Sequence, residues 1–472
     1  MYVAPENWTS GDSPVATTSP VISIIGNAQP IAIKNPTTES ASLVVQGYML
    51  TDATSSGLIT LGELGDTPSK GRLELSQGDL TVRDSSSTSN IVSIQGAGNN
   101  SSNRVGAQLK AQNIHLSNLE VDDSLIFVQG SERYTSNNNL ISEFNQSAIL
   151  NVTNNDNSSI FDVQNTIADS AITAHTGVSV EIDRIRLKGN TFRDAGISIG
   201  RDDNIKNNTT YRNHFEVFDT IFIEDTTVNG IGETGNFEGF ALRKTNASIV
   251  EDASGFTQPS GEAYPWKGTA LSVDGITVLA DRERVSGVFL ANNTFSNSKG
   301  NQDYPALFMT VSDIKVSDGV DVSFVEGIHF EGNAPKAEGD NLIISGTVTD
   351  IAASNSDIVG ITLKDNFDSA ENRSAGGTSY VNLTVDNLSS ANGHIIAIAV
   401  DQTNRQDEIT HLWDVNVSNL TSDNDTIGLD INNASVSIGD IDVEANYALK
   451  ANRSEIILGG RTGHFICKLE IP

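Results

Sequence analysis

Three basic residues occupy alternate positions of the run RIRLK, namely Arg184, Arg186 and Lys188. Ile185 and Leu187 lie between them. Alternate residues of an extended strand share one face, so the spacing predicts a basic row facing outward and two apolar residues facing inward. On a chain with a formal net charge of −31, such a row could bind an acidic glycan. The alternative, which the sequence favours, is an amphipathic strand whose charged face is only solvated.

Two aromatic residues, Tyr264 and Trp266, stand in the run YPWK, within an insert between strand-like runs. Exposed aromatic rings in a loop can stack on sugar rings, so this pair is a second candidate for ligand contact. The alternative is that the two rings cover a neighbouring strand.

The elements that would position these side chains come from a recurring phrase, Gly-apolar-x-apolar-x-x-Asn. The phrase ends at Asn293, Asn333 and Asn366, and RIRLKGN, which ends at Asn190, lacks only the glycine. Each phrase predicts a short strand followed by a turn. The spacing is 40 residues from 293 to 333 and 33 residues from 333 to 366. Strand–turn units with variable inserts predict an all-β fold, specifically a right-handed parallel β-helix with irregular coil lengths.

The closing asparagines, Asn190, Asn293, Asn333 and Asn366, would then stack on one another from coil to coil. We expect each of them to turn the chain in a left-handed or bridge conformation, which asparagine tolerates. Their side-chain amides could form a hydrogen-bonded ladder along the stack. The alternative is that asparagine recurs here only because it is a common turn residue.

The chain divides into three ranges by composition. Residues 1–20 are rich in Ser, Thr and Pro, which predicts a poorly ordered segment. Residues 21–460 carry the strand-like runs, which predicts a single β-helical domain. Residues 461–472 are expected to form a C-terminal cap or a truncation tail.

The composition of the chain limits which classes of partner it can bind. The chain has 60 acidic and 29 basic residues among its 472, and a surface this acidic repels nucleic acid and anionic lipid. No apolar run is long enough for a transmembrane helix, so we expect no membrane insertion by this segment. A single cysteine, Cys467, excludes an intramolecular disulfide. The 7 histidines are scattered without metal-binding spacing, so the sequence predicts no metal site and no cofactor.

The phrases resemble the passenger domains of bacterial autotransporters and the related polymorphic outer-membrane proteins. The shared element is an aromatic or aliphatic residue followed by Asn three positions later, as in FEGN (330–333), LANN (290–293), LKDN (363–366) and LKGN (187–190). The resemblance implies an adhesin-like structural or binding protein, secreted or displayed on a bacterial cell surface. Its partner would be a host-surface protein or a glycan, and the passenger would not be an enzyme.

A carbohydrate-active β-helix is the alternative function, either a polysaccharide lyase or a tailspike-like glycoside hydrolase. Polygalacturonase-like hydrolases carry clustered carboxylates, then Gly-His-Gly, then Arg-Ile-Lys. Here RIR (184–186) comes first, followed by Asp202 and Asp203, and then His394, which lacks the following glycine. Adjacent carboxylates of a strand point to opposite faces, so Asp202 and Asp203 make a poor acid–base pair. We therefore predict no catalytic residue.

Overall fold

All regular elements in the described part of the chain are β-strands. The computed structural model describes residues 21–25, 31–33, 36–39, 42–51, 57–62, 71–75, 78–96, 106–130, 148–175, 177–200, 213–230, 235–249, 269–296, 306–335, 342–365, 378–402, 409–458, 463–466 and 469–470. The fold of these ranges is all-β, as the sequence predicts. In the same ranges we find no helix with the length and apolar character needed to cross a membrane.

The chain separates into two compact units. The N-terminal unit is Met1–Phe218 together with Lys244–Asn246, and the C-terminal unit is Asp219–Arg243 together with Ala247–Pro472. This boundary lies within the range 21–460, which the sequence analysis treats as one domain. Residues 1–20 lie outside the described residues, whereas 461–472 contain two short strands, Gly463–Ile466 and Leu469–Glu470.

The strands of the N-terminal unit are short in its first half and longer toward its end. They are β1 (Val21–Ile25), β2 (Ile31–Ile33), β3 (Pro36–Glu39), β4 (Ser42–Gln46), β5 (Met49–Leu50), β6 (Gly57–Gly62), β7 (Arg72–Leu75), β8 (Asp79–Ser87), β9 (Asn90–Gln95), β10 (Ala107–Lys110), β11 (Asn113–Val121), β12 (Ile126–Gln129), β13 (Ala148–Val152), β14 (Ile160–Gln164), β15 (Ile167–Ala174), β16 (Val178–Lys188), β17 (Thr191–Ile199) and the first residues of β18 (Asn213–Val228).

The C-terminal unit takes the rest of β18 and the strands that follow. These are β19 (Asn236–Arg243), β20 (Thr245–Ile249, shared with the other unit), β21 (Thr269–Val278), β22 (Arg282–Ala291), β23 (Thr294–Ser296), β24 (Ala306–Val316), β25 (Val322–Glu331), β26 (Ala334–Pro335), β27 (Leu342–Ala353), β28 (Asp357–Lys364), β29 (Thr378–Ser390), β30 (Ile395–Asp401), β31 (Ile409–Ser422), β32 (Thr426–Asn432), β33 (Ser435–Glu444), β34 (Tyr447–Asn452), β35 (Glu455–Leu458), β36 (Gly463–Ile466) and β37 (Leu469–Glu470).

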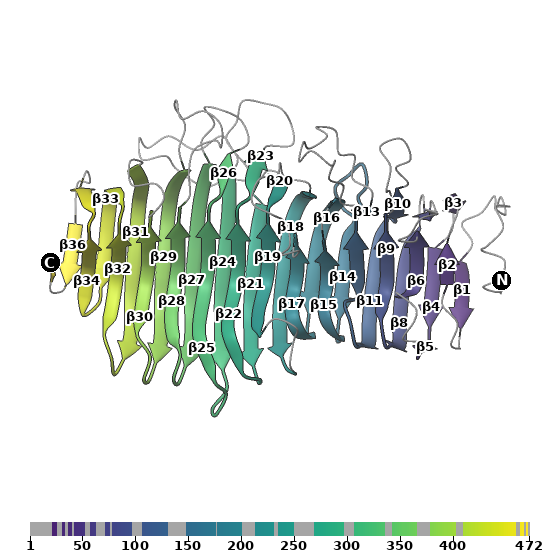
Figure 1. The fold of residues 1–472 in the computed structure, drawn as a ribbon, viewed down its shortest axis with the longest axis horizontal. Coiled ribbons are helices and arrows are strands. Elements are labelled where there is room, and N and C mark those ends of the chain that lie inside the picture. The colour runs from purple at the N-terminus through teal and green to yellow at the C-terminus, as the bar shows by residue number, and fades with distance from the viewer. Residues whose placement is uncertain are drawn as a thin grey trace, which may run out of the picture. The chain divides into compact units, whose positions relative to one another are not determined.

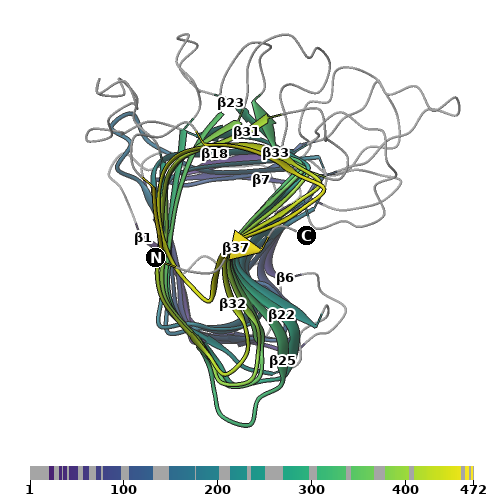
Figure 2. The ribbon, with the colours of Figure 1, turned by 90° about the vertical axis from the view of Figure 1, so that its left-hand side faces the viewer.

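Within each unit, strands pair in parallel with strands that come a few places later in the chain, most often two or three. In the C-terminal unit one ladder runs β21, β24, β27, β29, β31, β33, and a second runs β22, β25, β28, β30, β32, β34 (Figure 1). In the N-terminal unit β4, β8, β11, β14 and β16 form such a ladder. Seen end-on, β31 and β33 lie on one side of the C-terminal unit's interior and β22, β25 and β32 on another (Figure 2).

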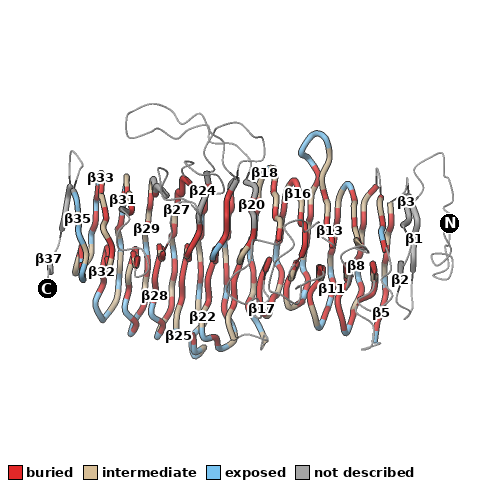
Figure 3. The backbone as a smooth tube through the Cα atoms, turned by 45° about the horizontal axis from the view of Figure 1, so that its top comes forward, coloured by how far each residue is buried: buried red, intermediate tan, exposed pale blue. Residues whose placement is uncertain are grey.

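The core of the C-terminal unit is built from columns of like side chains. In-register pairing stacks Val273, Val311, Val348, Val385 and Val417 on successive strands, and each is buried. Many of the residues between the inward ones face outward, so buried and more exposed positions alternate along much of the chain (Figure 3). Parallel strands lie about 4.8 Å apart, which lets branched side chains pack continuously along the column.

The glycine of the recurring phrase is explained by this stacking. A Cβ added to Gly287 would lie 2.5 Å from Val311 Cγ1 and 2.9 Å from the Gly327 carbonyl oxygen. One added to Gly327 would lie 2.5 Å from the Gly360 oxygen and 2.6 Å from Val348 Cγ1. All four contacts are far shorter than van der Waals distance, so only a residue without a side chain lets the next strand approach.

The turn after each phrase differs from the sequence prediction in one respect. The left-handed residue is the one before the closing asparagine: φ is 55° at Asn292 and 61° at Gly332. Asn293 and Asn333 do not have positive φ; their side chains point inward and are buried. The residue before the closing asparagine therefore makes the turn. The closing asparagine is buried instead, where its amide needs hydrogen-bond partners inside the unit.

Candidate functional site

The predicted basic row lies on β16, and its apolar partners Ile185 and Leu187 are fully buried. Register places Arg184, Arg186 and Lys188 opposite Ile160, Asp162 and Gln164 of β14. Arg184 Nη2 donates to the carbonyl oxygen of Ser158.

Asp162 neutralises part of the row. Its carboxylate lies beside Arg186, accepts a hydrogen bond from Gln164 Nε2 at 2.7 Å and lies 3.7 Å from His115 Nδ1. Burial alone would raise the pKa of Asp162, but the contacts with His115 and Gln164 and the charge of Arg186 hold it below its usual value. The row therefore includes a mixed-charge cluster, which makes it a weaker site for acidic glycans than the sequence alone suggests.

Five of the residues singled out in the sequence for ligand contact, the asparagine ladder or catalysis lie outside the described residues, namely Tyr264, Trp266, Asn366, Asp202 and Asp203. His394 is exposed in the C-terminal unit, where its backbone N–H donates to Asp357 Oδ1 at 2.8 Å.

The closing asparagines form hydrogen bonds across neighbouring strands. Asn293 Nδ2 donates to Asn333 Oδ1 at 2.9 Å, and the backbone N–H of Asn293 donates to the same oxygen at 3.0 Å. In the N-terminal unit Asn190 Oδ1 instead accepts the backbone N–H of Thr166 at 3.1 Å. These buried amides have hydrogen-bond partners inside the units, so they hold neighbouring segments together and are not exposed to a ligand.

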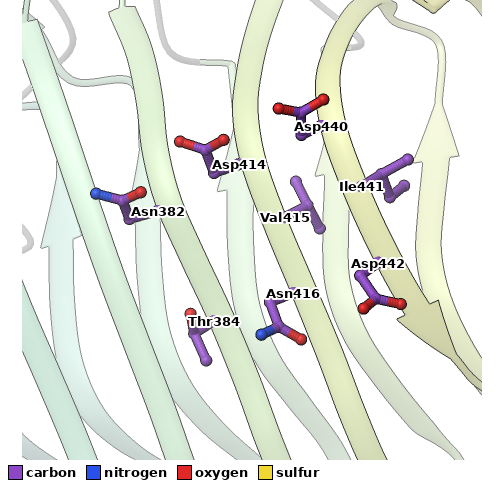
Figure 4. A pocket seen from close by; sticks show the side chains of 8 residues that line it. All are labelled: Asn382, Thr384, Asp414, Val415, Asn416, Asp440, Ile441 and Asp442. Carbon is purple, nitrogen blue, oxygen red and sulfur yellow. The ribbon is translucent and has the colours of Figure 1, made fainter. Parts of the chain in front are cut away.

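A depression lies on the outer face of β29, β31 and β33 in the C-terminal unit. It has a volume of about 360 Å³ and is lined by Asn382, Thr384, Asp414, Val415, Asn416, Asp440, Ile441 and Asp442. Figure 4 shows two rows of polar side chains crossing the three strands, with Val415 and Ile441 between them.

The two rows follow directly from the strand register. Asp414 pairs with Asp440, and Asn416 pairs with Asp442, so outward side chains of β31 and β33 lie next to one another. Like charges on adjacent strands repel. Partial burial, and then the charge of Asp440, raise the pKa of Asp414 above its usual value. The depression therefore offers an electronegative, hydrogen-bonding floor.

An aromatic pair precedes the depression on β31. The rings of His411 and Trp413 are stacked, with centroids 6.0 Å apart and planes within 11°. Trp413 is followed by Asp414 and is only partly buried. Burial lowers the pKa of His411, so the imidazole is neutral at pH 7 and presents an uncharged ring. Flat rings next to hydrogen-bonding groups are suited to a ligand with both apolar and polar faces.

The residues of the depression are far apart in the chain, so no local sequence pattern brings them together. A signal does exist: the runs DVN (414–416) and DID (440–442) both alternate polar and apolar residues. They meet only because β31 and β33 pair in this register. Across the described ranges, no group of three or more His, Cys, Asp or Glu side chains is arranged to hold a metal ion.

No protein family, curated protein or solved structure matches this chain.

Proposed function

We propose that both units are right-handed parallel β-helices and that the protein is an adhesin-like binding protein of the autotransporter-passenger type, secreted or displayed on a bacterial surface. Most strands pair in parallel with a strand that comes two or three places later in the chain, and these ladders support the β-helix. Crossovers between parallel strands are almost always right-handed, which supports the handedness. The recurring phrase ending in Asn supports the passenger resemblance.

The observation that carries the binding function is the open depression on β29, β31 and β33. Its floor is made of side chains that hydrogen-bond well to hydroxyl groups, and His411 and Trp413 provide flat rings on the same strand. An open polar surface of this kind binds a ligand without enclosing it, which fits a glycan held on an adhesive surface better than a small molecule in a pocket.

A glycan array with the intact chain tests this function, followed by titration calorimetry with the best ligand. We expect Asp414→Ala and Trp413→Ala each to weaken binding by about tenfold or more, which corresponds to about 1.4 kcal/mol. Asp156→Ala, an exposed aspartate of the N-terminal unit, is the matched control and should leave affinity unchanged. Binding that survives both variants of the depression would exclude this surface.

Glycoside hydrolysis is the second candidate, and the pairing of Asp414 with Asp440 favours it. Glycoside hydrolases commonly pair a carboxyl group of raised pKa, which acts as the general acid, with a second carboxylate. Reducing-end release from neutral and acidic polysaccharides is the measurement. Turnover that Asp414→Asn and Asp440→Asn both abolish, with ligand binding retained, would replace the adhesin function with a hydrolase.

A further inference from the structure

A buried histidine in the C-terminal unit lies between two carboxylates of its own strand. His329 Nδ1 lies 3.0 Å from Glu326 Oε1, and His329 Nε2 lies 3.0 Å from Glu331 Oε2. All three residues face the same side of β25 because the alternation of inward and outward residues shifts by one at Gly327. The side chain of His329 is 10% exposed and that of Glu326 only 1%.

This geometry defines the protonation state of the ring. A neutral imidazole has one N–H and can donate to one acceptor only. Two ionised carboxylates, one at each ring nitrogen, are both satisfied only when both nitrogens carry a proton. Below its folded-state pKa, His329 is therefore an imidazolium, and the three residues form a charged chain of Glu⁻, His⁺ and Glu⁻.

Neighbouring strands hold both ends of this chain. On β28, Thr362 Oγ1 donates to Glu326 Oε1, and Lys364 Nζ lies 2.9 Å from Glu331 Oε1. On β22, Ser286 Oγ donates to Glu326 Oε2 at 3.4 Å. The charged chain therefore joins β22, β25 and β28, which pair side by side.

The face of the imidazolium is covered by an aromatic stack. Phe289 of β22 lies parallel to the His329 ring, with centroids 4.5 Å apart. The guanidinium groups of Arg243, on β19, and Arg284 lie 4.5 Å and 4.4 Å from the Phe289 ring centroid. Both of these arginines contact Glu238, which balances part of their charge. The stack shields one face of the ring from water, and Glu326 and Glu331 are the acidic groups at its edge.

We propose that the Glu326–His329–Glu331 chain is a pH-controlled latch that clamps β22, β25 and β28 together while His329 is protonated and releases them when it loses its proton. Loss of one ring proton turns one N–H···carboxylate bond into a repulsive contact between a lone pair and a carboxylate. At Glu326, which is buried, water cannot replace a donor that is lost from Nδ1 of His329.

The direction of the pH dependence follows from the same contacts. Burial by itself lowers the pKa of His329, but the charges and hydrogen bonds of Glu326 and Glu331 outweigh it and raise the pKa above the usual 6.5. A raised folded-state pKa gives stability that is fully present below pH 6.5 and is lost as pH rises through the folded-state pKa. The latch is therefore closed in acid and opens as the pH rises past that value.

Hydrogen exchange read by mass spectrometry at a series of pH values, corrected for intrinsic rates, tests the latch on the intact chain. We expect amides of β25 and β28 to lose protection by roughly tenfold or more as the pH rises from 6.5 through the folded-state pKa of His329, which its carboxylate partners raise. Amides of β11 and β14 in the N-terminal unit are the internal reference and should change less. His329→Gln should remove the pH dependence from β25 and β28, and His115→Gln, its matched control, should not.

The same pH dependence in His329→Gln as in the unchanged protein would overturn the latch. If His329→Gln does not fold, nitrogen chemical shifts of ¹⁵N-histidine-labelled unchanged protein give the answer directly. Two protonated ring nitrogens on His329 at a pH above the usual 6.5 support the proposal. A ring that is already mostly neutral at pH 6.5, with one protonated nitrogen, refutes it.

Discussion

The two units contain the same acid–histidine contact in very different surroundings. In the N-terminal unit His115 is 39% exposed and lies 3.7 Å from Asp162, whereas in the C-terminal unit His329 is 10% exposed and has carboxylates at 3.0 Å on both ring nitrogens. Both histidines have raised pKa values, His115 mainly through its contact with Asp162. Solvent screens the first pair far more than the second, so only the second should contribute strongly to folding.

His411 completes the comparison, because it stacks on Trp413 and its pKa is lowered by burial alone. One residue type thus takes opposite pKa shifts within one fold. The presence of an acid partner decides the sign of the shift, and the burial of that partner decides how much stability depends on it.

The largest effect should come from removing the buried carboxylate beside His329. Glu326→Ala leaves a buried imidazolium with half of its acceptors, and we expect the C-terminal unit to lose about 3–5 kcal/mol. Urea unfolding followed by circular dichroism measures this loss. Asp162→Ala, the equivalent change beside His115, should cost less than about 1 kcal/mol. Equal losses would show that burial does not distinguish the two pairs.

The acid side of the profile should depend on Glu331. The hydrogen bond from His329, together with Lys364, lowers the pKa of Glu331 to about 2. A lowered carboxyl pKa gives stability that is present above the unfolded value of 4.5 and is lost as pH falls toward about 2. We expect Glu331→Gln to cost about 1–2 kcal/mol at about pH 7, reduced by the partial exposure of the side chain, and to cost little at about pH 2. Unfolding curves at both pH values measure the difference.

A smaller effect is expected at His115. His115→Gln should destabilise the N-terminal unit by less than about 1 kcal/mol at about pH 5. The cost should disappear at about pH 9, because a raised histidine pKa contributes only below the folded-state value. Thermal unfolding at the two pH values is sufficient. A cost at the higher pH as large as at the lower would mean that the side chain acts through packing and not through charge.

The smallest effect should be at His411, with the opposite sign. Its lowered pKa means that stability falls as pH drops from 6.5 toward the folded-state value, because the unfolded chain binds the proton more readily. An NMR titration of the histidine rings should place the midpoint of His411 below 6.5 and those of His115 and His329 above it. A midpoint above 6.5 for His411 would remove the contrast between buried histidines with and without an acid partner.

Local features of the fold could be predicted from the sequence, and features that depend on register could not. Alternation places Ile185 and Leu187 inward, because one strand alone determines which face each residue occupies. The meeting of Asp414 with Asp440 depends on which strands pair and on the lengths of the inserts between them.

Contacts between strands also explain where the structure departs from the sequence predictions. The sequence predicts the left-handed residue at Asn293, but it is Asn292, because the side-chain amide of Asn293 is buried and bound to Asn333. Glu326 and His329 are separated by an odd number of positions, and residues at such a spacing lie on opposite faces of a regular strand. Only the shift in alternation at Gly327 brings these two to one side. A sequence pattern read with strict alternation misses such a cluster.

The glycine column has a consequence for how this chain can diverge. Gly287, Gly327 and Gly360 are followed in the same column by Ala397, Gly428 and Ala448, so the column already tolerates a methyl group at two positions. At Gly287 and Gly327 even an alanine would need a smaller residue at the valine beside it, Val311 or Val348, and a shift of the neighbouring strand's backbone. Sequences that descend from a common ancestor with this chain should therefore show paired changes between the glycine and valine columns, a correlated substitution pattern set by the distance between strands.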